Sequence, residues 1–288
     1  MKRPHLLPIA LLLLALALPA HGWAQGFEGT VTMRQINVSQ MALASLIGED
    51  GDDEETEIDP KEVFAIPLER IIGLIGSDEG VEAEQITYHI KGNKLRVDDS
   101  SGGMPGYAIM DWGAGTFQLV SPDEKVVMEM TKKDFEDLKT MYPDDEGQPA
   151  QTKAEVRALN QTREINGMRT SAYEIKSIDE IAVVWVAPEL KDLVSTFRDF
   201  ESRMKEMGVI GDEEEQTEVF MLVAEHGFPV LEQTFKSYGG YGNGDYDISE
   251  IVLLERKTVS ADLFAVPADF ERRSFMEVIR MFGGKPDN

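Results

Sequence analysis

Short stretches of alternating apolar and polar residues, separated by turn sequences, make up most of the chain after its first 24 residues. Alternation with a period of two is typical of β-strands that have one buried face. The predicted strands are 27–35, a hairpin over 85–97, 107–111, 117–120, 125–130, 161–165, 169–177, 181–186, 219–225, 230–237 and 246–259. Short turns connect them, among them Gly92-Asn93 and Asn166-Gly167. The pattern therefore favours a meandering antiparallel sheet.

Stretches with apolar residues three and four positions apart interrupt this sheet and predict helices. They are 39–47, 60–75, 131–141, 188–207 and 270–282. Pro67 is expected to kink or split the second helix, because proline cannot donate the backbone hydrogen bond of a helix interior. Thr131 and Asp134 have the spacing of a helix-capping pair. We expect one domain over 25–288, with a helical and acidic insertion at about 37–82 and a helical insertion at about 188–215.

The first 24 residues have the pattern of a secretory signal peptide. Lys2 and Arg3 precede an apolar run at 6–18, and Gly22 and Ala24 place small residues at the −3 and −1 positions of the predicted cleavage after Ala24. The run is shorter than the roughly 20 apolar residues that a membrane-spanning helix needs. With 0 cysteines the chain lacks the residue that carries a bacterial lipid anchor. We expect a soluble periplasmic protein with no transmembrane segment after cleavage.

Charge and residue content limit the chemistry. The net charge is −25, and loss of Lys2 and Arg3 makes the remainder more acidic. Such a surface is a poor partner for nucleic acid, which binds basic patches. The absence of cysteine excludes thiol nucleophiles and zinc thiolate sites. Only His89 and His226 remain after cleavage, and we expect them to be exposed residues of a strand and a turn. We predict a protein that is not an enzyme, with no catalytic residue, cofactor or metal site.

The acidic and glycine-rich stretches do not alter that prediction. The acidic run 49–57 lacks the ligand spacing of a calcium-binding EF-hand loop. The glycine-rich stretch 238–244 has no lysine and no following helix, so it does not resemble a phosphate-binding loop. We expect both to be solvated loops. Whether acidic loops of this chain bind cations is left open.

Several phrases of the sequence resemble a bacterial family of exported proteins known only as a domain of unknown function. They are Phe27-Glu28-Gly29, ITYHIKGNKLRVD at 86–98, AIMDWGAGTFQLVSPDEKVVMEM at 108–130, TREINGMRTSAYEI at 162–175, Val184-Trp185 and FAVPADFE at 264–271. That family is in turn similar to periplasmic lipoprotein carriers of the LolA type. The resemblance implies an α+β fold, in which a curved antiparallel sheet forms an incompletely closed β-barrel with helices packed in or across its concave face.

The resemblance also implies a hydrophobic cavity that shelters an acyl chain. Aromatic and methionine side chains on or beside the predicted strands are the candidate lining, because such groups give large and adaptable apolar surface. They are Tyr88, Trp112, Phe117, Trp185, Met128 and Met221. The first hypothesis is a periplasmic binding protein whose partner is a lipid or a lipoprotein acyl chain. The alternative is a structural or interaction protein whose barrel is filled by its own helices and which acts through its acidic surface. The sequence identifies no protein partner.

Overall fold

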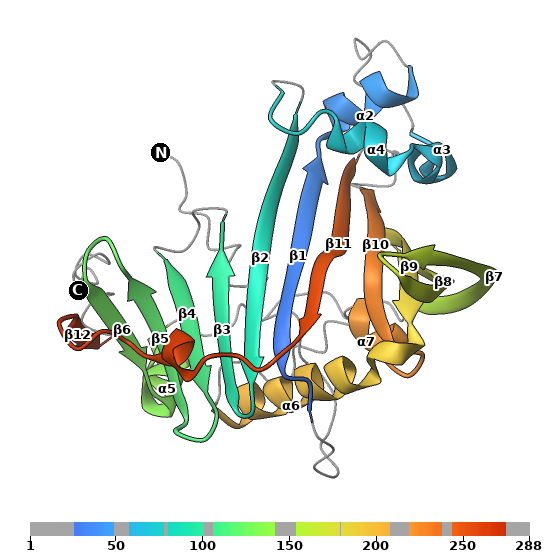
Figure 1. Cartoon of the computed structure of the whole chain (residues 1–288). Helices are drawn as coiled ribbons and strands as arrows, with labels where there is room; N and C mark the ends of the chain where they lie inside the picture. The colour runs from blue at the N-terminus through green and yellow to red at the C-terminus, as the bar shows by residue number, and fades with distance from the viewer. Residues whose placement is uncertain are drawn as a thin grey trace.

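A computed structural model gives the structure of the chain. It describes residues 26–48, 58–77, 80–100, 106–141, 154–178, 180–207, 219–237 and 244–274. The predicted signal peptide, the acidic run 49–57 and most of the glycine-rich stretch lie outside these residues. Figure 1 shows a curved sheet that does not close on itself, with helices at its margins and across one end.

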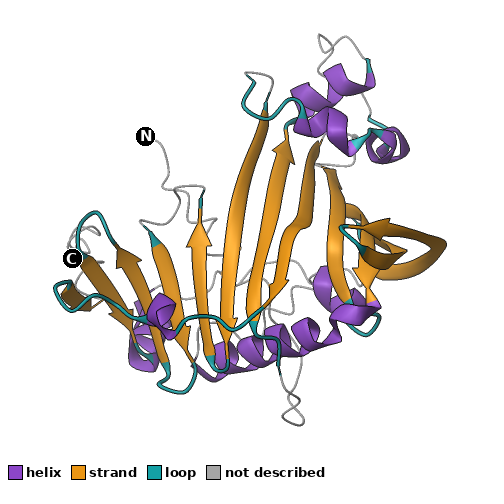
Figure 2. Cartoon of the chain, viewed as in Figure 1, coloured by secondary structure: helices purple, strands orange, loops and turns teal. Residues whose placement is uncertain are grey.

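The described residues form twelve strands in a single sheet. The strands are β1 (Gly29–Val38), β2 (Val81–Lys91), β3 (Lys94–Asp99), β4 (Tyr107–Asp111), β5 (Thr116–Ser121), β6 (Val126–Met130), β7 (Glu155–Ile165), β8 (Met168–Lys176), β9 (Glu180–Ala187), β10 (Phe228–Ser237), β11 (Gly244–Arg256) and β12 (Glu271–Ser274). Figure 2 shows how strongly strands predominate over helices. This is a mostly-sheet α+β fold.

The order of the strands is β12-β6-β5-β4-β3-β2-β1-β11-β10-β9-β8-β7. Strands β2 to β6 form one meander and strands β7 to β11 form another. Strand β1 joins the two meanders, because it pairs antiparallel with β2 on one side and with β11 on the other. All neighbouring pairs are antiparallel except β12 and β6. The first strand of the chain is thus central in the sheet, not at its edge.

The helices are short except for one. They are α2 (Gln40–Ile47), α3 (Pro60–Ala65), α4 (Leu68–Ile72), α5 (Lys132–Met141), α6 (Lys191–Met207) and α7 (Val219–Val223), together with the 3-10 turns η1 (Pro188–Leu190) and η2 (Ala261–Phe264). Pro67 separates α3 from α4, as the sequence predicts. Asp134 accepts hydrogen bonds from both the backbone N–H and the hydroxyl of Thr131. The predicted cap of α5 is therefore confirmed.

The two faces of the sheet are covered by different segments. Val31 and Ile36 lie an odd number of residues apart on β1, so their side chains point to opposite faces. Val31 belongs to a large cluster that includes the buried side of α6, and we call this side of the sheet the α6 face. Ile36 belongs to a second cluster, with side chains of α2, α3 and α4, on what we call the opposite face.

A C-terminal strap, residues 257–274, also covers the opposite face. It leaves the end of β11 and crosses the strands toward β6, as the red trace in Figure 1 shows. Val259 and Phe264 of the strap pack against Ile109, Val120 and Val127 of the sheet. Strand β12 then pairs with β6 and ends the described chain. The strap thus ties the last residues of the fold to strands that come much earlier in the sequence.

One predicted strand is wrong. The apolar run 219–225 is predicted as a strand, but Val219–Val223 forms helix α7. Strand β10 already pairs with β9 on one side and β11 on the other, so it has no free edge for another partner. Gly227 makes the entry to β10 instead of a hairpin turn. Its φ is +143°, and a Cβ added there would lie 2.3 Å from the backbone oxygen of Ala187.

The C-terminal helix predicted at 270–282 is also wrong where the structure describes it. Glu271–Ser274 forms β12, which pairs parallel with β6. The backbone N–H of Glu271 donates to the carbonyl of Lys125 at 2.8 Å, so pairing starts at the turn before β6. The unpaired edge of β6 therefore determines the local conformation more strongly than the helical periodicity does. Residues 275–282 lie outside the described part of the chain.

The strap is expected to contribute measurably to stability. Phe264→Ala removes a buried aromatic ring from the cluster under the strap, and such changes cost about 3 kcal/mol of unfolding free energy. Urea unfolding followed by circular dichroism measures this loss. Leu253→Ala is the matched control, because Leu253 is 42% exposed and its truncation leaves no cavity. Equal stabilities of the two variants would contradict a structural role for the strap.

Candidate functional site

The structure places four of the six predicted lining residues together on the α6 face. Tyr88, Trp112 and Phe117 are buried in the same apolar cluster, and Met128 packs against its margin. Trp185 lies in the cluster on the opposite face, so the sheet itself separates it from the other four. Met221 belongs to α7, and its side chain lies outside the described part of the structure.

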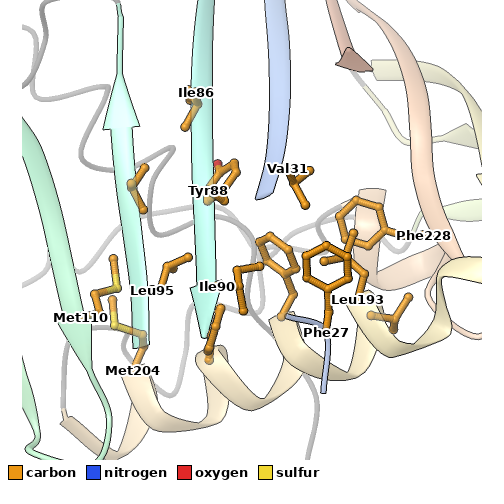
Figure 3. Close-up of a cluster of buried hydrophobic side chains, with 14 of the residues drawn as sticks. Phe27, Val31, Ile86, Tyr88, Ile90, Leu95, Met110, Leu193, Met204 and Phe228 are labelled. Atoms are coloured by element: carbon orange, nitrogen blue, oxygen red, sulfur yellow. The ribbon is translucent and has the colours of Figure 1, made fainter. Parts of the chain in front are cut away.

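Two helices supply the partners of these aromatic rings. Tyr88 contacts Phe197 of α6 edge to face, with ring centroids 5.7 Å apart. Trp112 lies 5.2 Å from Phe200 of the same helix. Phe117 contacts Phe135 of α5 at 6.3 Å. Figure 3 shows this cluster between α6 and the strands, with Met204 of the helix among the sheet side chains. In this arrangement the protein's own helices cover the aromatic surface.

Helix α6 covers the sheet because its apolar residues form one stripe. Leu193, Phe197, Phe200 and Met204 follow one another at spacings of three and four, which places them on one side of a helix. All four are buried against the sheet. Val194 also belongs to this cluster, whereas Ser195, Asp199, Arg203 and Glu206 are exposed. Helix α6 thus covers most of this apolar cluster, while Phe135 of α5 covers Phe117.

Polar contacts attach the N-terminal half of α6 to the sheet. Asp192 binds the guanidinium of Arg256 through both carboxylate oxygens, and one of these contacts measures 3.0 Å. These hydrogen bonds, which Arg256 donates and Asp192 accepts, lower the pKa of Asp192 and raise the pKa of Arg256. The backbone N–H of Phe27 donates to the hydroxyl of Thr196 at 2.9 Å. These contacts position the helix over β1 and β11.

Some of the polar side-chain atoms buried on or beneath α6 have no hydrogen-bond partner among the described residues. The indole Nε1 of Trp112 and the Nε of Arg198 are buried, and neither has a hydrogen-bond partner in the described structure. Glu201 is fully buried on the same helix and forms an ion pair with Lys205 at 3.1 Å. A buried donor without an acceptor costs about 1–3 kcal/mol. These unpartnered donors therefore reduce the stability that the packing of α6 on the sheet provides.

Beyond the apolar cluster, the α6 face becomes polar. Glu232 of β10 lies there with Glu180 of β9 and Asp247 of β11, while Lys236 donates to Asp247 at 2.7 Å. Burial raises the pKa of Glu232 to about 7, and the neighbouring Glu180 adds to this effect. A hydrogen bond from the Thr234 hydroxyl, 3.1 Å away, acts in the other direction. One face of the sheet thus combines an apolar zone with an acidic zone.

His89 is more enclosed than the sequence predicts. Its side chain is 20% exposed and lies between Thr30 and Asp98 on the opposite face. Its Nδ1 is 3.1 Å from the Thr30 hydroxyl and its Nε2 is 3.3 Å from a carboxylate oxygen of Asp98. Burial lowers the pKa of His89, although the charge of Asp98 acts to raise it. Pairing of distant strands creates this row of side chains, and no local sequence motif signals it.

A hydroxyl, an imidazole and a carboxylate in contact are also the parts of a nucleophilic relay. Here Thr30, His89 and Asp98 belong to adjacent strands of the sheet interior, where ladder pairing uses the backbone N–H groups that an oxyanion hole would need. Their neighbours hold the strap instead. Lys91 donates to the carbonyl of Val259, and Arg96 donates to the carbonyl of Leu263 at 3.0 Å. The geometry fits a structural row that fixes the strap.

The second histidine and the acidic groups form no further centre among the described residues. His226 stacks on Tyr173 with ring centroids 4.5 Å apart. Within the described ranges, no group of three or more His, Asp or Glu side chains is arranged to hold a metal ion. None of the helices that the structure describes is both long and apolar enough to cross a membrane.

The sequence missed the polar contacts of this site more than its apolar ones. The aromatic residues are conspicuous as large side chains on predicted strands. Arg256, Thr196 and Glu201 are ordinary polar residues whose roles depend on where α6 crosses the sheet. One signal for Glu201 was available. It occupies the apolar stripe of a predicted helix, between Phe197 and Met204, where a charged residue is unexpected.

Comparison with protein families gives one match. The model of the family described as Domain of unknown function (DUF4412) matches residues 72–270. The matched region extends from the end of α4 to the strap, so it contains β2 to β11 and helix α6. The search of curated proteins gave no match.

Solved structures show only distant likeness. An uncharacterized conserved protein from Thermus thermophilus is 6% identical with a TM-score of 0.33, covering 66% of this chain and 83% of that one. PNGF-II matches in two crystal forms, each 8% identical, with TM-scores of 0.33 and 0.32. Those matches cover 88% of this chain and 33% of PNGF-II. At these values the likenesses carry no argument about function. The resemblance to LolA-type carriers stays a prediction.

The acidic zone predicts a pH-dependent stability. An unfolded glutamate ionises near 4.5, whereas Glu232 in the folded protein has a pKa of about 7. Between these values the folded protein retains a proton that the unfolded chain has released, so stability falls as the pH rises through this range. Glu232→Gln removes this loss and is expected to raise the melting temperature at pH 8 by about 3 °C or more.

Thermal unfolding at pH 4.5 and pH 8 measures the effect. At pH 4.5 the variant and the wild type are expected to melt together, because most of the stability difference due to Glu232 arises only at higher pH. Asp123→Asn is the control, since Asp123 is exposed in the turn before β6 and its charge loss should change neither melting temperature. If the melting temperature of Glu232→Gln changes between pH 4.5 and pH 8 as much as that of the wild type does, the pH dependence does not arise from Glu232.

Proposed function

Because this chain belongs to the DUF4412 family, whose function is unknown, we propose a function from its structure: it binds a hydrophobic acyl chain between the sheet and helix α6. The proposed partner is a lipid or a lipoprotein acyl chain, and the proposed role is that of a non-enzymatic carrier. The signal-peptide pattern of the first 24 residues supports export to the periplasm. A LolA-like half-barrel is the finer description of the fold that goes with this proposal.

The observation that carries the proposal is the way in which one helix covers the aromatic surface. In the described structure, the ring of Tyr88 packs on Phe197 of α6, and the ring of Trp112 packs on Phe200 of the same helix. Apolar side chains are not directional partners, so an acyl chain can replace the helix stripe without loss of specific bonds. Lipid-binding sites are concave and mostly apolar, with few polar groups. The α6 face has this composition.

The polar contacts of α6 support a helix that moves as a unit. Its residues 191–207 contain no proline or glycine, the usual causes of a sharp kink. The buried indole N–H of Trp112 and Nε of Arg198 lack partners when the helix is closed. Their desolvation disfavours the closed position, while the Asp192–Arg256 ion pair favours it. Burial of the apolar stripe of α6 also favours the closed position, so an acyl chain must replace this apolar contact when the helix moves.

A reversible tether tests whether α6 must move. The chain has no cysteine, and a Cβ added at Gly26 would lie 3.1 Å from the side-chain oxygen of Thr196. In the double variant Gly26→Cys/Thr196→Cys these positions are within reach of a disulfide, whose Cβ atoms lie about 3.8 Å apart. The tether lies beside the Tyr88–Phe197 contact, so it closes the region that an acyl chain would enter. Uptake of a fluorescent fatty acid is expected to fall by about tenfold or more in the oxidised protein.

Reduction with dithiothreitol should restore uptake to the level of the single variants Gly26→Cys and Thr196→Cys, which lack the disulfide. Native mass spectrometry of wild type purified from the periplasm then identifies any lipid that copurifies. Full uptake by the oxidised double variant would exclude movement of α6. Failure of the wild type to bind any acyl probe, with no copurifying lipid, would overturn the binding function itself.

A second candidate function follows from the same packing. Helices α5 and α6 fill the aromatic surface with their own side chains in the described structure, so the face can serve as a permanent core. The protein would then act as a structural or interaction protein through its acidic surface. This alternative predicts a wild type that takes up no acyl probe, with or without the tether.

A further inference from the structure

We propose that the indole N–H of Trp112 binds the carbonyl oxygen of the ligand, and that the ligand class is a neutral acyl ester instead of a free fatty acid. This inference rests on the proposed function and specifies its ligand. It assigns one residue to the polar end of the site and a chemical class to the molecule that the site takes.

The geometry of Trp112 carries the first part. The residue follows β4, and its backbone N–H donates to the carbonyl of Asn93 at 2.9 Å, which fixes its position beside the β2–β3 turn. Its ring packs on Phe200 at 5.2 Å, and the residue is 8% exposed. The indole Nε1 is buried without a hydrogen-bond partner. Buried indole N–H groups usually have an acceptor, so we assign the ligand oxygen to this donor.

The surroundings carry the second part. The cluster that contains Trp112 consists of apolar residues, among them Phe117, Met110 and Met130. Because the members of this cluster are apolar, burying a free carboxylate among them would cost far more than burying a neutral carbonyl. Glu201 is already a buried carboxylate on the covering helix, and Lys205 is its ion-pair partner. Lys205 is therefore already paired with that carboxylate, whereas an ester supplies an acceptor that needs no cation.

Matched probes of one chain length separate the contributions of the chain and the carbonyl. We choose a brominated fatty acid methyl ester, the corresponding free acid and a brominated alkane, each added to residues 25–288 and followed by quenching of tryptophan fluorescence. The wild type is expected to bind the ester about tenfold more tightly than the alkane, the amount expected for one buried hydrogen bond. At pH 8 the free acid is expected to bind more weakly than the ester.

Trp112→Phe keeps an aromatic ring and removes the donor. It is expected to bind the ester only as tightly as the alkane, with alkane affinity unchanged from wild type. This loss of preference would not result from a general change in packing. Trp185→Phe is the matched control, because it removes an indole from the opposite face and should keep the preference for ester. In Trp112→Phe the remaining Trp185 reports binding less directly, so calorimetry measures that variant.

A measurement on an unchanged Trp112 keeps the proposal testable if the variant does not fold. In the ¹⁵N-labelled Trp185→Phe protein, the remaining indole N–H signal should move downfield on addition of ester and stay in place with alkane. The role of Trp112 would be overturned if the wild type bound ester and alkane with equal affinity, or if the indole N–H signal did not move on addition of ester. Either result would leave acyl binding intact. Absence of binding by all three probes would overturn the proposed function instead.

Discussion

The fold depends on covering a wide curved sheet on both of its faces. Twelve strands give the sheet two surfaces, and each alternating strand sends apolar residues to at least one of them. On one face, helix α6 provides the cover with a stripe that includes Phe197 and Phe200. On the opposite face, the short helices α2 to α4 cover one part of the sheet and the strap covers another. Elements that are distant in sequence are therefore held together because each buries apolar side chains of the same sheet.

The two covers differ in how they are attached. The strap is held by backbone carbonyls that accept from Lys91 and Arg96, by apolar packing around Phe264 and by the β12–β6 ladder. Helix α6 has side-chain contacts near its start and aromatic contacts along its length. A segment fixed through its backbone at several points resists displacement more than one attached through side chains. This asymmetry is the physical reason for proposing a binding site beneath α6 and a structural role for the strap.

The sequence predicted the strands that alternate and the turns that have a defined chemistry. The β2–β3 hairpin, the split at Pro67 and the cap of α5 all follow from local rules, and all are confirmed. The errors arise where pairing over long distances decides. Residues 219–223 are apolar enough for a strand but have no free edge to join, and residues 271–274 become a strand because β6 offers one. Local periodicity contains no information about either edge.

The same division applies to the candidate site. Large aromatic side chains on strands are visible in the sequence, and four of the six chosen residues lie in one cluster. Trp185 is separate because strand alternation, counted across the paired strands β9, β10, β11 and β1, puts it on the other face. The buried N–H of Trp112 could not be predicted, since its lack of an acceptor depends on what α6 places above it. A ligand that supplies this acceptor would favour one arrangement of α6 on the sheet over others. The chemistry of the ligand and the packing of α6 on the core are therefore energetically coupled in the proposed function.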